Sequence, residues 1–266
     1  MTETMPPIPK ITLITGAAKR LGRAIALDMA RAGWDVAVHF GTSHADAVQT
    51  VNAIRALGRR AVALQADLSD AAQVSGLIDR CTRELGIPDC LVNSASLFQY
   101  DTASSFQYAN LDIHMRINVA APITLARDLQ RVRQASPERS ATPGVVINLL
   151  DQKLANPNPD FLSYTLSKAA LQQATTLLAQ ALAPHLRVVG VAPGITLVSG
   201  DQTPEGFANA HTMTPLGKSS TPQDISAAVV DLATAHAVTG TTLYVDGGQH
   251  LQPSERDVMF LSCRPT

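Results

Sequence analysis

ITLITGAAKRLG, residues 11–22, joins a short apolar run to a turn that contains two glycines. The run 11–15 predicts a buried strand, and residues 23–32 have the spacing of a helix that ends at Gly33. A glycine-containing turn between a strand and a helix lets backbone N–H groups approach a pyrophosphate, whose charge the helix dipole favours. The stretch therefore predicts a dinucleotide-binding unit, with a tight turn that binds nothing as the alternative.

The same alternation continues along the chain. We expect further strands at 36–40, 61–66, 91–92, 145–149, 188–191 and 242–245, and helices at 45–57 and 71–85. The strands are continuous apolar runs, which is typical of a parallel sheet covered on both faces. Right-handed crossovers then give an α/β fold, a single-domain Rossmann-type, doubly wound, seven-stranded parallel sheet with helices on both faces. The domain spans 10–251, between a flexible N-terminus (1–9) and a C-terminal tail (252–266) without an assigned role.

Composition excludes several classes of protein. The chain has 266 residues and a net charge of -1, and a balanced charge argues against nucleic acid or an anionic bilayer as partner. No apolar run approaches the ~18 residues of a membrane span. The start, MTETMPPIPK, lacks the pattern of a signal peptide. The cysteines show no C-x-x-C spacing and the histidines no metal-ligand spacing. We expect a cytoplasmic protein without a metal site.

Residues near the glycine turn bear on the choice of dinucleotide. An acidic residue after the second strand would accept the ribose hydroxyls of NAD, but residues 39–43 read HFGTS. Lys19 and Arg20 lie in the turn, where they could meet a 2′-phosphate. This favours NADP(H), with His39, Thr42 and Ser43 as further phosphate contacts. The alternative is that Lys19 and Arg20 are solvated loop charges.

A tyrosine and a lysine supply candidate chemistry. Tyr164 and Lys168 are four residues apart in SYTLSKAAL, so a helix there places them on one face. An ammonium near the phenol would lower the phenol's pKa from about 10, which suits a general acid or base near neutral pH. Asp151 follows the strand at 145–149, and Asn118 lies in the helical stretch MRINVAAP.

Together these pieces resemble the short-chain dehydrogenase/reductase family over about residues 10–251. The matching motifs are TGAAKRLG (15–22), NSAS (93–96), the Tyr164–Lys168 pair and DGG (246–248). The resemblance implies that Tyr164 donates the proton, and that Lys168 lowers the pKa of Tyr164 and holds the nicotinamide ribose. It also implies that Asn118 supports a water relay and that Asp151 polarises the substrate. The implied cofactor contacts are Gly16, Lys19, Arg20, Leu21, Gly22, His39, Phe40, Thr42, Ser43, Asp67, Leu68, Asn93, Ser94, Ala95, Lys168, Pro193 and Gly194.

Departures from the general family pattern resemble its pteridine reductase branch, which includes bacterial dihydromonapterin reductases. Arg20 replaces the usual middle glycine of the turn, and Asp151 replaces the usual serine. The sequence NSAS (93–96) replaces the usual Asn-Asn-Ala-Gly. In those relatives a pterin lies between the nicotinamide and an aromatic ring, which implies stacking on Phe98. The implied substrate contacts are Ser96, Phe98, Asp151, Tyr164 and Leu197. One mismatch is Gly41-Thr42, where many of these relatives carry an arginine.

The aspartate has a chemical rationale. A carboxyl whose pKa is raised by desolvation can deliver a proton to a pterin ring nitrogen, which a hydroxyl cannot do. The alternative is that Asp151 only caps the following loop. Residues 199–215 are polar, contain two prolines and two glycines and follow the sixth strand, so we expect them and Leu197 to close over the substrate. The resemblance further implies that a homotetramer forms through the helices that carry Asn118 and Tyr164.

We therefore expect an NADPH-dependent reductase of a dihydropterin, with dihydromonapterin, dihydrobiopterin and dihydrofolate as candidates. One alternative within the same class is a reductase of a ketone, such as a sugar or an acyl-chain carbonyl. The other is an NADP(H)-binding sensor without catalysis.

Overall fold

One parallel sheet organises the molecule. The computed structural model describes residues 9–198 and 203–261, and in this part of the chain seven strands lie in the order β3-β2-β1-β4-β5-β6-β7. All neighbouring pairs are parallel. Because the order reverses between β1 and β4, a crevice is expected beyond their carboxyl ends. The strands are β1 (Ile11–Ile14), β2 (Asp35–Phe40), β3 (Ala61–Gln65), β4 (Cys90–Asn93), β5 (Gly144–Leu149), β6 (Leu186–Pro193) and β7 (Thr242–Val245).

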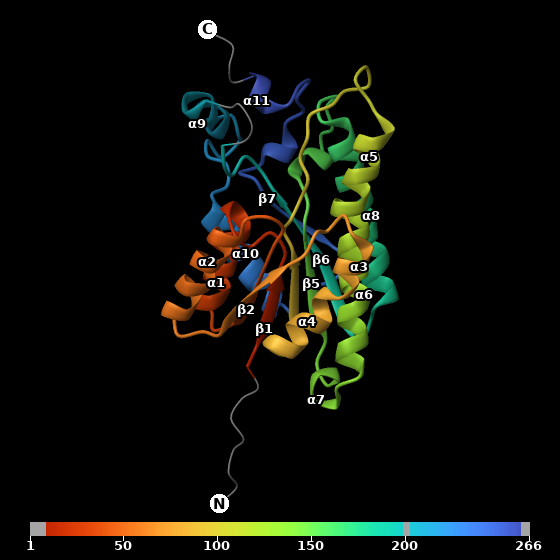
Figure 1. The fold of residues 1–266 in the computed structure, drawn as a ribbon. Coiled ribbons are helices and arrows are strands. Elements are labelled where there is room, and N and C mark those ends of the chain that lie inside the picture. The colour runs from red at the N-terminus through yellow and green to blue at the C-terminus, as the bar shows by residue number, and fades with distance from the viewer. Residues whose placement is uncertain (1–8, 199–202, 262–266) are drawn as a thin grey trace, which may run out of the picture.

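Helices cover both faces of the sheet (Figure 1). One face carries α1 (Arg20–Arg31), α2 (His44–Ala56) and α10 (Pro222–Thr234). The other carries α3 (Ala71–Ser75), α4 (Leu77–Glu84), α6 (Ala121–Gln134) and α8 (Leu162–Ala181). The short α7 (Pro137–Ser140) lies at the opposite end from α9 (Pro204–Thr212) and α11 (Val258–Leu261). The remaining pieces are α5 (Tyr108–Met115), the π-helix η1 (Arg116–Ala120), and the 3-10 turns η2 (Gln152–Leu154) and η3 (Gln249–Leu251).

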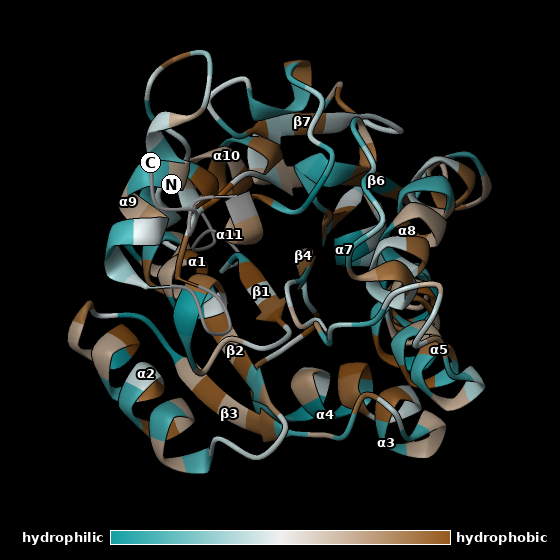
Figure 2. Ribbon diagram, turned by 90° about the horizontal axis from the view of Figure 1, so that it is seen from above, coloured by the Kyte–Doolittle hydropathy of each residue, from teal (hydrophilic) through white to brown (hydrophobic). Residues whose placement is uncertain are grey.

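Two apolar clusters fill the spaces between sheet and helices. Every residue of β2 and of β5 is buried. β-Branched residues such as those of β5 suit a strand that packs on both faces. Viewed from above, much of β1 and β3 is brown, and the helices around the sheet carry both teal and brown residues (Figure 2). None of the helices in the described part of the chain is long and apolar enough to cross a bilayer.

The observed fold confirms the predicted class, and the seven strands overlap the predicted ones. The helix expected at 71–85 is wrong as a single element, because it is divided into α3 and α4 at Gly76. Glycine is a poor helix former, and its backbone freedom permits this break. Residues 1–8 of the expected N-terminal segment, residues 199–202 of the expected cover, and residues 262–266 lie outside the described residues.

Candidate active site

The glycine turn is closed tightly at the carboxyl end of β1. Gly16 has φ +65, and a Cβ there would lie 3.0 Å from the Cα of Ala95. A Cβ on Gly22 would lie 2.3 Å from the carbonyl oxygen of Gly16. α1 has no acidic residue in its first turn, so the positive end of its dipole has no carboxylate next to it. The turn therefore provides a backbone cradle suited to an anion at the start of α1.

The side chain of His39 forms hydrogen bonds that hold this turn in place. Its Nδ1 accepts the N–H of Gly16 at 3.1 Å, and its Nε2 lies 3.1 Å from the carbonyl oxygen of Ala66, to which it can donate. Burial lowers the pKa of His39 to about 4. The imidazole is therefore neutral, with both nitrogens in use. The prediction that His39 contacts a phosphate does not fit this placement, because the ring has neither a charge nor a free donor to offer.

The two basic residues of the turn already have partners. The Lys19 ammonium lies 3.0 Å from the carboxylate of Asp46 on α2. Arg20 has φ +52, a value that L-residues rarely adopt and that fits its position where the family usually has glycine. Its guanidinium donates to the carbonyl oxygen of Val198 at 2.8 Å, so the side chain spans the crevice from α1 to the segment after β6.

A cavity of about 520 Å³ lies beyond the carboxyl ends of β1, β2 and β3. Asp67 and Leu68 contribute to it, although the Asp67 carboxylate also accepts from the backbone and hydroxyl of Ser69. Phe40, which was predicted to contact the cofactor, is only 4% exposed and packs into the core. Ser43 lies at the N-terminal end of α2. The lining residues are Gly16, His39, Gly41, Thr42, Gln65, Ala66, Asp67, Leu68, Gln73, Ala95, Ser96, Leu97 and Ile117.

Thr15 ties the glycine turn to the loop after β4. Its hydroxyl oxygen accepts the N–H groups of Ser94 and of Ala95, each at 3.0 Å. The Asn93 amide donates to the side-chain oxygen of Asn148 at 2.8 Å inside the sheet. Asn93 thus supports the crevice from within the sheet. Thr15 is a residue that the sequence interpretation missed, and its signal is a hydroxyl placed directly before Gly16.

The tyrosine of the predicted pair contacts the aspartate. The Tyr164 hydroxyl donates to Oδ2 of Asp151 at 2.8 Å, while Oδ1 of Asp151 accepts the N–H of Lys153 at 2.9 Å. Asp151 therefore both caps the turn η2 and reaches the phenol. Burial raises the pKa of Asp151, as its sequence position predicted.

Lys168 lies beside the same phenol. Its ammonium is 5.7 Å from the centre of the Tyr164 ring and donates to the carbonyl oxygen of Leu149 at 2.7 Å. Burial lowers the pKa of Lys168 to about 8. The expectation that Lys168 brings the tyrosine pKa toward neutrality is wrong for this structure. Burial and the neighbouring Asp151 carboxylate hold the pKa of Tyr164 well above its usual value, so the phenol keeps its proton.

Asn118 joins the loop after β4 to α8. Its Nδ2 donates to the carbonyl oxygen of Leu97 and to the hydroxyl of Ser167, at 3.0 and 2.9 Å. Its Oδ1 accepts from the N–H of Leu97 and from the hydroxyl of Ser96. All four hydrogen-bonding positions of the amide are thus occupied, and the side chain has a positioning role. It lies in the π-helix η1, a feature that is frequent at functional sites.

An aromatic cluster packs against the Tyr164 ring. The Phe98 ring stacks on Phe161 with centroids 4.2 Å apart and meets Tyr164 edge-on at 4.7 Å. Phe98 is 38% exposed. Because one face of Phe98 is covered by Phe161, only the opposite face can stack on a substrate. Phe161 has φ +56 and was not predicted, since no local pattern marks it.

One cavity of about 130 Å³ brings the predicted substrate residues together. Phe98, Asp151, Tyr164, Gly194 and Leu197 all line it. Pro193 ends β6 directly before Gly194. Ser96 instead lines the 520 Å³ cavity beyond β1. Asp151 and Phe98 therefore face the same space as the phenol, which is the arrangement that the pterin hypothesis required.

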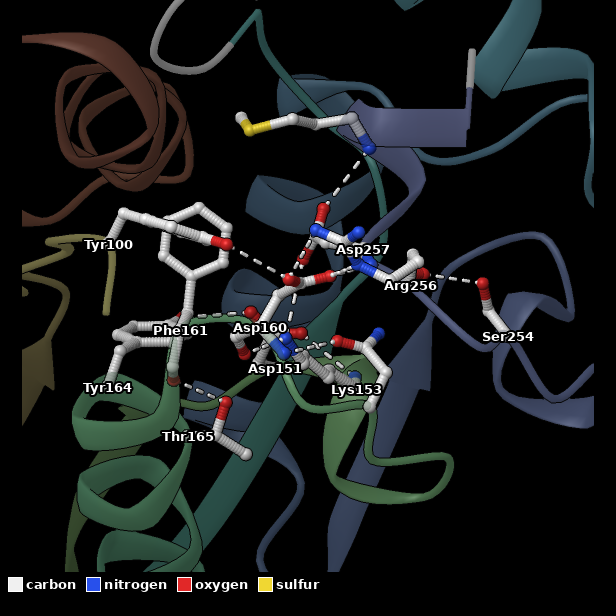
Figure 3. A network of polar contacts seen from close by, with 12 residues as sticks. Tyr100, Asp151, Lys153, Asp160, Phe161, Tyr164, Thr165, Ser254, Arg256 and Asp257 are labelled. Atoms are coloured by element: carbon white, nitrogen blue, oxygen red, sulfur yellow. Dashed lines mark hydrogen bonds and ion pairs between the residues drawn. The ribbon is translucent and has the colours of Figure 1, made fainter. Parts of the chain in front are cut away.

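The C-terminal segment also lines this cavity, which the sequence did not predict. Asp257, Val258 and Met259 contribute to the lining. Figure 3 shows Asp257 and Arg256 close to Asp151, Lys153 and Asp160. In the described part of the predicted cover, α9 does not line this cavity but contributes Ala210 to a neighbouring one. Within residues 9–198 and 203–261 no group of His, Cys, Asp and Glu could hold a metal ion.

The site thus combines an anion cradle, a buried acid pair and an apolar ring platform in one crevice. A planar, uncharged heterocycle that must receive a proton fits such a site, because the platform favours stacking and burial raises the pKa of Asp151 and of Tyr164.

Comparison with known proteins gives consistent matches. A family model described as enoyl-(acyl carrier protein) reductase matches residues 16–250. The chain is similar to the alternative dihydrofolate reductase 1, FolM, of Brucella canis, whose structure is complexed with NADP. The identity is 38%, the TM-score is 0.86, and the match covers 92% of this chain and 95% of that one.

Known relatives of similar identity differ in their named substrates. The chain is 32% identical over 289 residues to pteridine reductase 1 of Leishmania tarentolae, covering 93% of this chain and 99% of that protein. It is 33% identical over 251 residues to 3beta-hydroxysteroid dehydrogenase 1 of Eggerthella lenta, covering 92% and 95%. Identity alone therefore does not choose the substrate, and the choice depends on the residues of the site.

Proposed function

This chain belongs to the short-chain dehydrogenase/reductase family of oxidoreductases, and we propose that it reduces a dihydropterin, such as dihydromonapterin, dihydrobiopterin or dihydrofolate, at the expense of NADPH. The observation that carries the proposal is the 2.8 Å contact between Tyr164 and Asp151 in a cavity roofed by Phe98. A reductase of ketones needs one proton donor and has no use for a second acid beside the tyrosine.

The glycine turn fits a dinucleotide. Gly22 lies so close to the carbonyl of Gly16 that position 22 has no room for a side chain. The surface of the turn that would face the pyrophosphate is therefore formed by backbone atoms. The cavity of about 520 Å³ beyond β1 and β2 is the proposed site of the adenosine part. Lys168, Pro193 and Gly194 are proposed contacts of the nicotinamide end. When bound, the reduced cofactor supplies the hydride that a ring carbon of the substrate accepts.

The protein supplies the proton. Tyr164 and Asp151 share one hydrogen bond, and the raised pKa of each favours its protonated form. Reduction of a C=N bond adds a hydride to carbon and a proton to nitrogen, and we assign the proton to this pair. Lys168 lies beside the pair, with its ammonium fixed by the Leu149 carbonyl. Asn118 fixes the loop that carries Phe98.

The preference for NADPH is proposed to rest on Lys19, Arg20, Thr42 and Ser43. No acidic residue follows β2 between residues 39 and 43, so the ribose site lacks the carboxylate that would repel a 2′-phosphate. Thr42 lines the proposed adenosine site. The solved relative FolM of Brucella canis is a complex with NADP, which supports the same preference here.

We also propose that the chain assembles as a homotetramer in the cytoplasm. Helices α5 and α8 expose large side chains, with Tyr108 87%, Leu177 55% and Leu166 46% accessible. Such side chains suit an interface between copies. Light scattering during gel filtration gives the mass that tests this.

The deciding experiment measures oxidation of NADPH against a panel of dihydropterins, dihydrofolate and ketones, with Tyr164→Phe as the inactive control. We expect the highest kcat/KM with a dihydropterin, at least about tenfold above any ketone, since the buried acid pair is built for a ring nitrogen. Faster turnover of a sugar or acyl-chain ketone would refute the proposal. Binding of NADPH without turnover of any substrate would instead identify a sensor.

A further inference from the structure

The segment that follows the sheet returns to the catalytic cavity and is held there by three contacts. Both nitrogens Nε and Nη2 of Arg256 donate to the Asp160 carboxylate, each at 2.8 Å (Figure 3). The backbone N–H of Asp257 donates to Oδ2 of Asp160 at 2.7 Å. The ring of Phe260 lies parallel to Phe161, with centroids 6.2 Å apart. We call residues 254–260 the C-terminal strap.

Asp160 is an anchor built into the protein. Its carboxylate is 1% exposed and also accepts from the Tyr100 hydroxyl. Burial acts to raise the pKa of Asp160, but the Arg256 guanidinium and the Asp257 N–H outweigh it and hold that pKa below its usual value. A buried carboxylate is costly without a cationic partner. Asp160 therefore needs the Arg256 guanidinium of the strap as a partner for its buried charge.

The strap places one carboxylate in the substrate cavity. Asp257 lines the same space as Asp151, Phe98 and Tyr164. Its Oδ2 is 3.5 Å from the Lys153 ammonium, and its side chain keeps 20% of its surface accessible. Its Oδ1 already accepts the N–H of Met259 at 3.2 Å. A carboxylate has about four acceptor positions, so each oxygen of Asp257 retains the capacity to bind a further N–H donor. After burial, the charge of Asp257 is a further cause of the raised pKa of Asp151 and of Tyr164.

We propose that Asp257 determines specificity by accepting the paired N–H donors of the substrate ring, the 2-amino group and the adjacent N3–H. This inference rests on the proposed function. Two parallel N–H donors match the two oxygens of a carboxylate, as a guanidinium does. Asp257, on the strap, then binds the amino end of the pterin ring. Asp151, beside η2, takes part in protonating the ring at another position. The Lys153 ammonium, 3.5 Å from Oδ2, orients the carboxylate.

The test compares two substrates that differ at one position, a 2-amino dihydropterin and its 2-oxo counterpart with the same side chain. For the wild type we expect a preference of about 10- to 100-fold in kcat/KM for the 2-amino compound, because the oxo group would face a carboxylate without a donor. Asp257→Asn is expected to reduce this preference to about threefold or less through KM, with kcat within about threefold.

Binding gives a second readout that is independent of turnover. Quenching of the fluorescence of the oxidised pterin, measured with NADP⁺ present, reports the dissociation constant. Asp257→Asn is expected to weaken binding of the 2-amino pterin about 10-fold or more and to leave the 2-oxo compound unchanged. Glu255→Gln removes the same charge from an exposed position of the strap and is the matched control, with wild-type values expected. Arg256→Ala, which releases the anchor, is expected to lose the preference in the same way as Asp257→Asn.

The outcomes separate this inference from the proposed function. Reduction of the 2-amino dihydropterin by Asp257→Asn with its preference intact overturns the role of Asp257 alone. The role of Asp257 is also overturned if the effect of Asp257→Asn on kcat/KM depends on the substituent at position 6 of the pterin and not on its 2-amino group. A wild type that neither binds nor reduces any pterin overturns both. Restoration of the preference by Asp257→Glu supports the role of the carboxylate.

Discussion

The hydroxyl of Tyr164 lies 2.8 Å from Oδ2 of Asp151, so the phenol and the carboxyl form one hydrogen-bonded unit. The two side chains come from α8 and from the turn after β5, and both face one cavity. Burial raises the pKa of each. Burial thus favours the protonated form of each group, which suits the proposed transfer of a proton to the substrate.

Replacement of Asp151 by Asn should abolish most pterin reduction. The amide preserves the size of the side chain and its cap on η2 through the Oδ1 position, but it cannot give up a proton. We expect kcat to fall about 10²- to 10⁴-fold, the usual contribution of general acid catalysis. NADPH binding, followed by the fluorescence of the nicotinamide, should remain within about twofold. Full turnover by this variant would exclude Asp151 as a proton donor.

The pH profile should decline toward alkaline pH. Because the reaction uses a protonated acid whose pKa is raised, kcat/KM should stay level at low pH and fall as pH increases through that pKa. Initial rates with a slowly reduced dihydropterin, recorded over the pH range in which the fold is stable, give the curve. A rate that increases steadily with pH would mean that an ionised group carries the reaction.

His39 should make the protein sensitive to acid. Its pKa of about 4 in the folded chain lies below the 6.5 of an unfolded histidine, so only the unfolded state takes up a proton between these values. Stability is therefore lost as pH falls from 6.5 toward 4, by about 3 kcal/mol in total. Urea unfolding of the wild type and of His39→Gln across this range measures it.

The glutamine variant should start less stable at pH 7, because contacts to Gly16 and Ala66 are weakened, yet lose less on acidification. Equal losses for both proteins would mean that His39 is not the group that titrates.

Lys19 should set part of the preference for NADPH. Its ammonium is shared with Asp46 at 3.0 Å, an exposed ion pair worth at most about 1 kcal/mol. Asp46→Asn should therefore raise the ratio of kcat/KM for NADPH over NADH by no more than about fivefold, and Lys19→Ala should lower it. Arg31→Ala, on the outer end of α1, serves as a control for loss of a positive charge. An unchanged ratio in both variants would place the phosphate elsewhere.

The sequence was informative where patterns are local. Continuous apolar strands and the glycine turn predicted the sheet, and the four-residue spacing predicted that Tyr164 and Lys168 share a helix face. The raised pKa of Asp151 followed from its place after β5. The strands, the glycine turn and the shared helix face depend on residues that are close in the chain. The burial of Asp151 follows from the fold that these local patterns predict.

The errors concern contacts between distant segments. His39 looked like a phosphate ligand because its partners, Gly16 and Ala66, belong to other loops. Asp160 and Arg256 are 96 residues apart, and no periodicity connects them. A titratable group also takes its pKa from everything packed around it, which is why the effect of Lys168 on Tyr164 was misjudged.

The cavity that contains Tyr164 is lined by two parts of the chain that are held in different ways. The phenol and the acid beside it are fixed by α8 and β5, whose burial tolerates little change. The opposite wall comes from residues beyond the last strand, joined to the body chiefly through Arg256 and Asp160. A change in the strap can therefore alter this wall of the cavity while β5 and α8 stay as they are.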